Sequence, residues 1–98
     1  MSHEIHFRPE AESDIEGAAV WYEKQREGLG THFLDEVLGT CETISENPNL
    51  CPVVHRHTQR AIMHRFPFGI YYRIEDELIV VIAVMHGSRH PKHWQKRT

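Results

Sequence analysis

The chain has 98 residues, 40% of them hydrophobic, and a formal net charge of −3 at pH 7. This length and hydrophobic content suit one folded domain over residues 1–98 and exclude wholesale disorder. No segment has the pattern of a signal peptide or the length needed to span a bilayer, so we expect a cytoplasmic protein with no membrane partner.

The first half of the chain predicts a strand followed by a helical hairpin. Residues 4–8 alternate polar and apolar side chains, as a short half-buried strand does. Pro9 suits the first position of a helix, and apolar side chains then recur at helical spacing, so we expect a helix over residues 9–25. A glycine-containing break at residues 28–30 joins it to a second helix, which Pro48 ends.

The apolar side chains of the two predicted helices should face a common core, because they recur at helical spacing. On the first helix we expect Trp21 to help the packing of the stripe formed by Ala11, Ile15, Ala18, Ala19 and Tyr22. The stripe of the second helix consists of Phe33, Val37, Cys41 and Ile44, widened by Leu34 and Leu38.

The second half predicts strands, at residues 53–57, 60–66, 70–74 and 78–85, with turns at residues 58–59 and 75–77. Residues 78–85 form the only continuous apolar run, and β-branched side chains fill five of its eight positions, so we expect a central strand buried on both faces. The links are too short for crossovers, which favours an antiparallel meander of three or four strands. The predicted fold class is therefore α+β, with an N-terminal strand, a helical hairpin and then the meander.

Charge is divided unequally between the two halves of the chain. Residues 1–50 hold eleven acids against three Lys and Arg, a net charge of −8, whereas residues 51–98 hold eight Lys and Arg against three acids, a net charge of +5. This polarity suggests that the second half meets an acidic partner or a phosphate backbone. The alternative is that acidic helices and a basic sheet attract each other within the fold.

Four arginines of the second half are candidate binding residues. Arg60, Arg65 and Arg73 lie on predicted strands, where Arg65 and Arg73 could lie close together across a hairpin, and Arg89 follows the last strand. Clustered guanidinium groups recognise phosphate or carboxylate groups through paired, planar hydrogen bonds. The alternative is that each arginine solvates an outward face or pairs with an acid of the helices.

His86 and Arg89 form a second candidate pair at the end of the predicted central strand. RNA cleavage by attack of a 2′-hydroxyl group needs a histidine that moves a proton and an arginine that stabilises charge on the phosphate. The alternative is that His86 caps the sheet by bonding to a neighbouring backbone group, and we favour it because no second proton-transfer residue stands at a fixed spacing.

The remaining motifs predict neither a metal site nor a cofactor. His55 and His57 share a strand face, but no cysteine pair has the spacing of zinc ligands. The sequence also lacks a glycine-rich phosphate loop and a nucleophile elbow. We expect Cys41 and Cys51 to be reduced thiols in or near the core, and Trp94 to hold the C-terminal tail against the domain.

In their order and spacing, these motifs resemble the RelE/ParE superfamily of toxins from bacterial type II toxin–antitoxin systems, which serve in plasmid stabilisation and growth inhibition. The resemblance runs nearly end to end. Its motifs are Phe7-x-Pro9-Glu10-Ala11, Trp21-Tyr22-Glu23, Gly28-Leu29-Gly30, Ile70-Tyr71-Tyr72-Arg73 and His86-x2-Arg89-x-Pro91-x2-Trp94. The resemblance implies a small sheet packed on a helical hairpin, a cognate antitoxin that wraps the toxin and binds operator DNA itself, and toxicity when the toxin is free.

The superfamily contains two activities, and the resemblance alone does not decide which of them this chain has. RelE-like members cleave mRNA on the ribosome from a basic surface, and a chain of that kind would use His86, Arg89 and Arg65 as catalytic residues. ParE-like members inhibit DNA gyrase and are not enzymes. The acidic helical hairpin and the Trp21 and His86 motifs look more ParE-like, so we favour gyrase as the target.

Because the second half of the chain carries a net charge of +5, we expect it to bind the antitoxin or the target through Arg60, Arg65, Arg73, Arg89 and Trp94, with a segment of the antitoxin added against the sheet. A further possibility is a decayed toxin that only binds its antitoxin. Harmless expression of the chain without any antitoxin would favour that reading.

Overall fold

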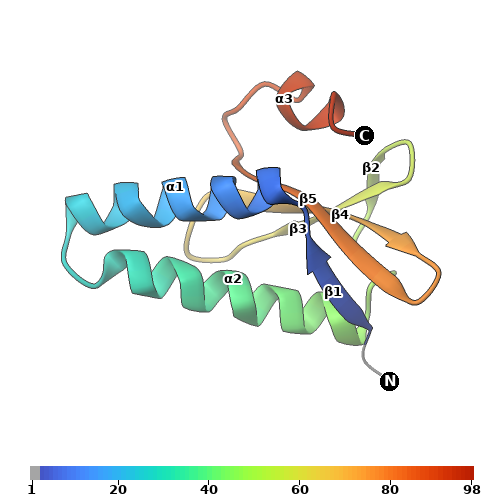
Figure 1. Ribbon diagram of the computed structural model, residues 1–98, viewed down its shortest axis with the longest axis horizontal. Helices are drawn as coiled ribbons and strands as arrows, with labels where there is room; N and C mark the ends of the chain where they lie inside the picture. The colour runs from blue at the N-terminus through green and yellow to red at the C-terminus, as the bar shows by residue number, and fades with distance from the viewer. Residues whose placement is uncertain (1–2) are drawn as a thin grey trace.

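A five-stranded sheet with helices on both faces forms the framework of residues 3–98, the part of the chain that the computed structural model describes (Figure 1). The strands lie in the order β1-β5-β4-β3-β2. They are β1 (Glu4–Phe7), β2 (Val53–His55), β3 (Thr58–Ile62), β4 (Phe68–Glu75) and β5 (Leu78–His86). The helices are α1 (Pro9–Gln25), α2 (Leu29–Glu46) and α3 (Lys92–Gln95).

The predicted α+β class, the helical hairpin and the antiparallel meander are confirmed. Strands β2 to β5 pair antiparallel, and β5 lies in the sheet between β4 and β1, as its apolar sequence predicted. Strand β1 runs parallel to β5, a pairing that the sequence analysis did not predict. The alternation of polar and apolar residues in β1 indicated a half-buried strand, but alternation alone does not select a neighbour.

Strand β5 contains a bulge opposite Tyr71 and Tyr72 of β4. Tyr71 pairs with Ala83 and Tyr72 with Val81, so Ile82 is an extra residue in β5. As a result, both Ile82 and Ala83 pack on the α3 side of the sheet, whereas Val81 packs on the side of α1 and α2.

The prediction of a strand at residues 60–66 after a turn at residues 58–59 is wrong. The turn falls at residues 56–57, with Arg56 in the left-handed region at φ 54°, and β3 starts directly after it at Thr58. Gln59 is a buried strand residue because its Nε2 donates to the carbonyl oxygens of Pro48 (2.7 Å) and Cys51 (2.9 Å). Residues 63–67 form a loop that leads into β4.

Helices α1 and α2 form the predicted hairpin and lie side by side in Figure 1. Their separation is small at Gly30, where an added Cβ would lie 2.6 Å from the carbonyl oxygen of Ala19. The Glu23 carboxylate accepts the backbone N–H groups of Gly28 (2.9 Å) and Gly30 (3.0 Å), which caps the start of α2. These contacts join the Trp21-Tyr22-Glu23 and Gly28-Leu29-Gly30 motifs in the fold.

Three side chains that the sequence analysis placed in the core are exposed instead. Trp21, Leu34 and Leu38 are 57%, 40% and 63% exposed. Helical spacing identified the correct apolar stripe, but its width was overestimated, because residues at the margin of a stripe face solvent as readily as the core. None of the helices described over residues 3–98 is long and apolar enough to cross a membrane.

The two faces of the sheet carry separate apolar clusters and different charges. Helices α1 and α2, which hold nearly all the acids of the first half, cover one face over a core that includes Phe33, Ile70 and Tyr72. The short, basic α3 lies apart from them and covers part of the other face over Tyr71 and Met85 (Figure 1). The unequal division of charge along the sequence therefore places an acidic layer on one side of the sheet and a basic segment on the other.

Candidate functional site

Arg60 and Arg73 lie on the face of the sheet that α3 partly covers. Arg60 pairs with Tyr71 across β3 and β4, which makes Arg73 its diagonal neighbour, roughly 7–8 Å away. The aliphatic part of the Arg60 side chain passes over Gly69. A Cβ atom at position 69 would lie 3.1 Å from Cδ of Arg60, so a glycine at this position gives the arginine the space it occupies. Arg73 donates from Nη2 to Oε2 of Glu75 at 2.7 Å.

This face has unused hydrogen-bonding capacity. The Nε atoms of Arg60 and Arg73 and the hydroxyl of Thr58 are buried and have no hydrogen-bond partner among the described residues. Each such atom carries a desolvation cost, which a bound acceptor could relieve if the side chains shifted toward it. Arg60 extends over Gly69, on the opposite side of Tyr71 from Arg73, so each guanidinium group would meet a separate acceptor on this face.

Arg65 lies elsewhere, which contradicts the expected pairing of Arg65 with Arg73. Arg65 belongs to the loop before β4, and roughly 16 Å of strand separates that loop from Arg73. The Glu36 carboxylate of α2 accepts the backbone N–H groups of His64 (2.7 Å) and Arg65 (3.0 Å) and so anchors the loop. Arg65 lines a hollow together with His32, Asp35 and Glu36, an acidic setting that does not favour phosphate.

His86 lies at the end of β5, and its ring is held by the turn that follows. The backbone N–H of Ser88 donates to Nδ1 of His86 at 3.0 Å, and the Ser88 hydroxyl lies 2.8 Å from the same atom. Because Nδ1 accepts the backbone bond, the neutral ring carries its proton on Nε2. This geometry fits the alternative in which His86 caps the sheet, since a base would need an unprotonated nitrogen free to face a substrate.

A groove of about 490 Å³ runs between α1 and the end of β5. Trp21 and Tyr22 of α1 and Phe68 of β4 form its aromatic part, and His86 and Arg89 close its other side. Arg89 and His86 therefore share one groove, as the sequence suggested. Arg65 lies outside it, so the three predicted catalytic residues are not gathered in one site.

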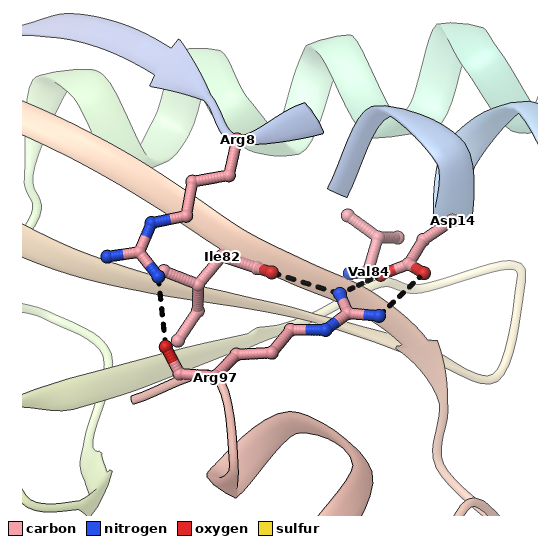
Figure 2. A network of polar contacts seen from close by, with 5 residues as sticks. All are labelled: Arg8, Asp14, Ile82, Val84 and Arg97. Carbon is pink, nitrogen blue, oxygen red and sulfur yellow. Dashed lines mark hydrogen bonds and ion pairs between the residues drawn. The ribbon is translucent and has the colours of Figure 1, made fainter. Parts of the chain in front are cut away.

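A polar network that includes Asp14 and Val84 of this groove ties the C-terminus to α1 and β5 (Figure 2). The Arg97 guanidinium bonds to both carboxylate oxygens of Asp14, at 2.7 and 3.2 Å, and to the carbonyl oxygen of Ile82 at 3.1 Å. Oδ2 of Asp14 also accepts the backbone N–H of Val84 at 3.0 Å. Arg8 donates to the carbonyl oxygen of Arg97 at 2.9 Å. The network as a whole therefore provides hydrogen-bond partners for the backbone groups of Ile82 and Val84 at the bulge of β5.

Trp94 holds α3 against the sheet, as predicted. Its ring stacks on Tyr71 with centroids 4.4 Å apart, and only 4% of the residue is exposed. Desolvation, and then the nearby cations including Arg89 and Lys96, lower the pKa of His93 on the same helix. The C-terminal segment therefore presents a positive surface while its tryptophan is used for packing.

No three His, Cys, Asp or Glu side chains of residues 3–98 are grouped so that they could hold a metal ion. Cys41 and Cys51 are free thiols, buried and partly buried respectively. Burial raises the pKa of the Cys41 thiol to about 11, which keeps it protonated and unreactive at neutral pH.

The sequence analysis missed Asp14, Arg97 and Glu36 as organising residues. The Arg97 side chain is partly buried by its ion pair, but nothing in the local sequence distinguishes this residue from the other cations near the C-terminus, Lys92 and Lys96. Only the fold brings together two residues 83 positions apart.

Comparison with known proteins gives one family and several similar structures, two of which are described below. The family described as the ParE toxin of the type II toxin–antitoxin system parDE matches residues 5–91. The chromosomal ParDE toxin–antitoxin system of P. aeruginosa has a similar chain, with a TM-score of 0.75 and 10% identity over 87% of this chain and 96% of that one. The RelBE2 toxin–antitoxin complex of Mycobacterium tuberculosis gives a TM-score of 0.65 and 20% identity over 91% and 95% of the two chains. At these identities the two structures demonstrate a shared fold. The search of curated protein sequences found no match.

Proposed function

Because the chain belongs to the ParE toxin family of type II toxin–antitoxin systems, we propose that it inhibits DNA gyrase when free and is neutralised by a cognate antitoxin. The family match over residues 5–91 is the observation that carries this proposal. The acidic helical hairpin supports it as well, since a ribosome-directed toxin must approach a dense array of phosphate groups.

The geometry gives little support to the alternative, a ribosome-dependent mRNA endoribonuclease. Arg65 lies beside the acids of α2, away from His86 and Arg89. Nδ1 of His86 is occupied by the backbone of Ser88, so the ring offers a donor to its surroundings rather than a base. Proton transfer and phosphate stabilisation would need these groups to converge on one phosphate.

The basic side of the sheet is the surface that we assign to the antitoxin. Arg60 and Arg73 are diagonal neighbours there, and their Nε atoms lack acceptors. A segment of the antitoxin that carries carboxylates would supply those acceptors and neutralise the positive charge. Arg89 extends the same positive charge toward the end of β5, whereas Trp94 would contribute indirectly by fixing α3.

Charge reversal at Arg60 and Arg73 tests this assignment. The double variant Arg60→Glu/Arg73→Glu should bind the antitoxin at least tenfold more weakly than the unchanged toxin, because like charges would then face each other. Isothermal titration calorimetry measures the affinity. The control is Lys24→Glu/Arg26→Glu, the same change in charge at exposed positions near the tip of the hairpin, which should bind normally. Equal affinity of both double variants would contradict the assignment.

A further inference from the structure

The C-terminal part of the chain carries positive charge that no nearby acid in the sequence balances. Residues 78–98 contain four Lys and Arg and three histidines but no Asp or Glu. One of these cations, Arg97, is used inside the fold in its ion pair with Asp14. The other three are exposed and form no ion pair within residues 3–98, and we call them the α3 surface: Arg89, Lys92 and Lys96.

The fold holds the lysines of the α3 surface in one arrangement. Trp94 stacks on Tyr71 on one side of α3, and Arg97 ties the end of the helix to α1. Lys92 and Lys96 stand four positions apart, so they project from the same side of the helix with Cβ atoms roughly 5–6 Å apart. Trp94 is two positions from each of them and therefore projects from the opposite side. The burial of Trp94 thus directs both lysines toward solvent.

Neighbouring elements add positive charge to this side of the molecule. The ring of His55 in β2 contacts Trp94 with centroids 5.9 Å apart, so the turn after β2, which carries the exposed Arg56, lies beside α3 (Figure 1). Desolvation, and then the cations of the α3 surface and His90, lower the pKa of His93, so these cations gather around one ring. Most acids of the first half belong to α1 and α2, on the other face of the sheet.

The α3 surface has the composition of a surface that binds the backbone of a double-stranded nucleic acid. The centre of a protein interface is apolar or aromatic, and no exposed large apolar side chain among the described residues lies within residues 78–98. The two aromatic rings at α3, Trp94 and Tyr71, are each only 4% exposed, so neither can stack on the bases of a single strand. A duplex presents its phosphate groups without any stacking, and lysine binds phosphate as a point charge.

We propose that the α3 surface binds the phosphate backbone of double-stranded DNA directly, without reading the base sequence. Contacts to phosphate groups position a protein on a duplex and carry no sequence information themselves. DNA is the duplex that a genome offers in large excess as non-specific sites. This inference goes beyond the proposed function, because it requires neither gyrase nor the antitoxin.

Fluorescence anisotropy of labelled DNA duplexes, titrated with the free full-length chain, tests the proposal. We expect a Kd of roughly 10⁻⁶–10⁻⁴ M at about 0.1 M salt, similar for duplexes of unrelated sequence. Three phosphate contacts predict that the logarithm of the affinity falls with the logarithm of the salt concentration with a slope of about −3. Lys92→Gln/Lys96→Gln should bind at least tenfold more weakly, and its slope should be smaller by about 2, because two of the contacts are lost.

The matched control is Lys24→Gln/Arg26→Gln, which removes the same charge from exposed positions near the tip of the hairpin and should keep both the affinity and the slope. Circular dichroism checks that both double variants are folded. Equal affinities and slopes of the two double variants would overturn the proposal, as would the absence of binding at low salt. Tighter binding of a single-stranded RNA of the same length would overturn the choice of duplex DNA. Because neither gyrase nor the antitoxin is present, all of these outcomes leave the proposed function standing.

Discussion

Replacing Asp14 with alanine is expected to lower the free energy of unfolding by about 3 kcal/mol, the typical cost of removing one partner of a buried ion pair. The side chains of Asp14 and Arg97 are 16% and 19% exposed, so the remaining guanidinium would stay largely buried without its counter-ion. The variant also leaves the N–H of Val84 without its acceptor at the bulge of β5. Urea unfolding followed by far-ultraviolet circular dichroism measures the loss.

A double-mutant cycle separates the ion pair from other effects of the substitution. Arg97→Met removes the charge and keeps most of the side-chain length, and Asp14→Ala/Arg97→Met removes both charges. The double variant should be less destabilised than the sum of the two single variants, because no charge is left alone. Additive effects would mean that Asp14 and Arg97 stabilise the fold independently, contrary to the geometry in Figure 2.

Gly30→Ala should destabilise the domain by about 2–3 kcal/mol, in the range of overpacked cores. The added Cβ would lie 2.6 Å from the backbone oxygen of Ala19 and 3.0 Å from the Glu23 carboxylate, so α1 and α2 would have to separate. Gly39→Ala on the same helix is the matched control, because its Cβ would meet nothing within 4 Å. That control should gain roughly 0.5–1 kcal/mol from the higher helix propensity of alanine. Opposite shifts in the urea midpoint are expected, and equal ones would contradict the close approach at Gly30.

The elements with a strong local signal could be predicted from the sequence. Helical spacing and Pro9 gave the bounds of α1 correctly, and the apolar run from Leu78 gave β5 and its central place. Strand β3 was misplaced because its position depends on the left-handed conformation of Arg56 and on the burial of Gln59, an amide whose partners are the carbonyls of Pro48 and Cys51. Polar residues that are buried by tertiary hydrogen bonds give no hydrophobic signal.

The candidate site was predicted only in part, because tertiary placement decides which charges meet. His86 and Arg89 do line one groove, since His86 ends β5 and Arg89 follows it in the next turn. Arg65 was grouped with Arg73 on the assumption of a long strand, and the loop held by Glu36 places it elsewhere. The exposure of Trp21 could not be predicted either. Helical periodicity does not show whether an apolar residue at the margin of the apolar face packs in the core or lies on the surface.

The most direct test of the proposed function is a supercoiling assay with purified DNA gyrase, run beside an assay of mRNA integrity in translating ribosomes, both with the free toxin. We expect inhibition of gyrase with accumulation of cleaved DNA, intact mRNA, and recovery of gyrase activity when the antitoxin is added. Codon-positioned cuts in mRNA with unaffected gyrase would contradict the proposal and make His86 and Arg89 catalytic candidates. Activity in neither assay would leave the chain as an antitoxin-binding module without a toxic target.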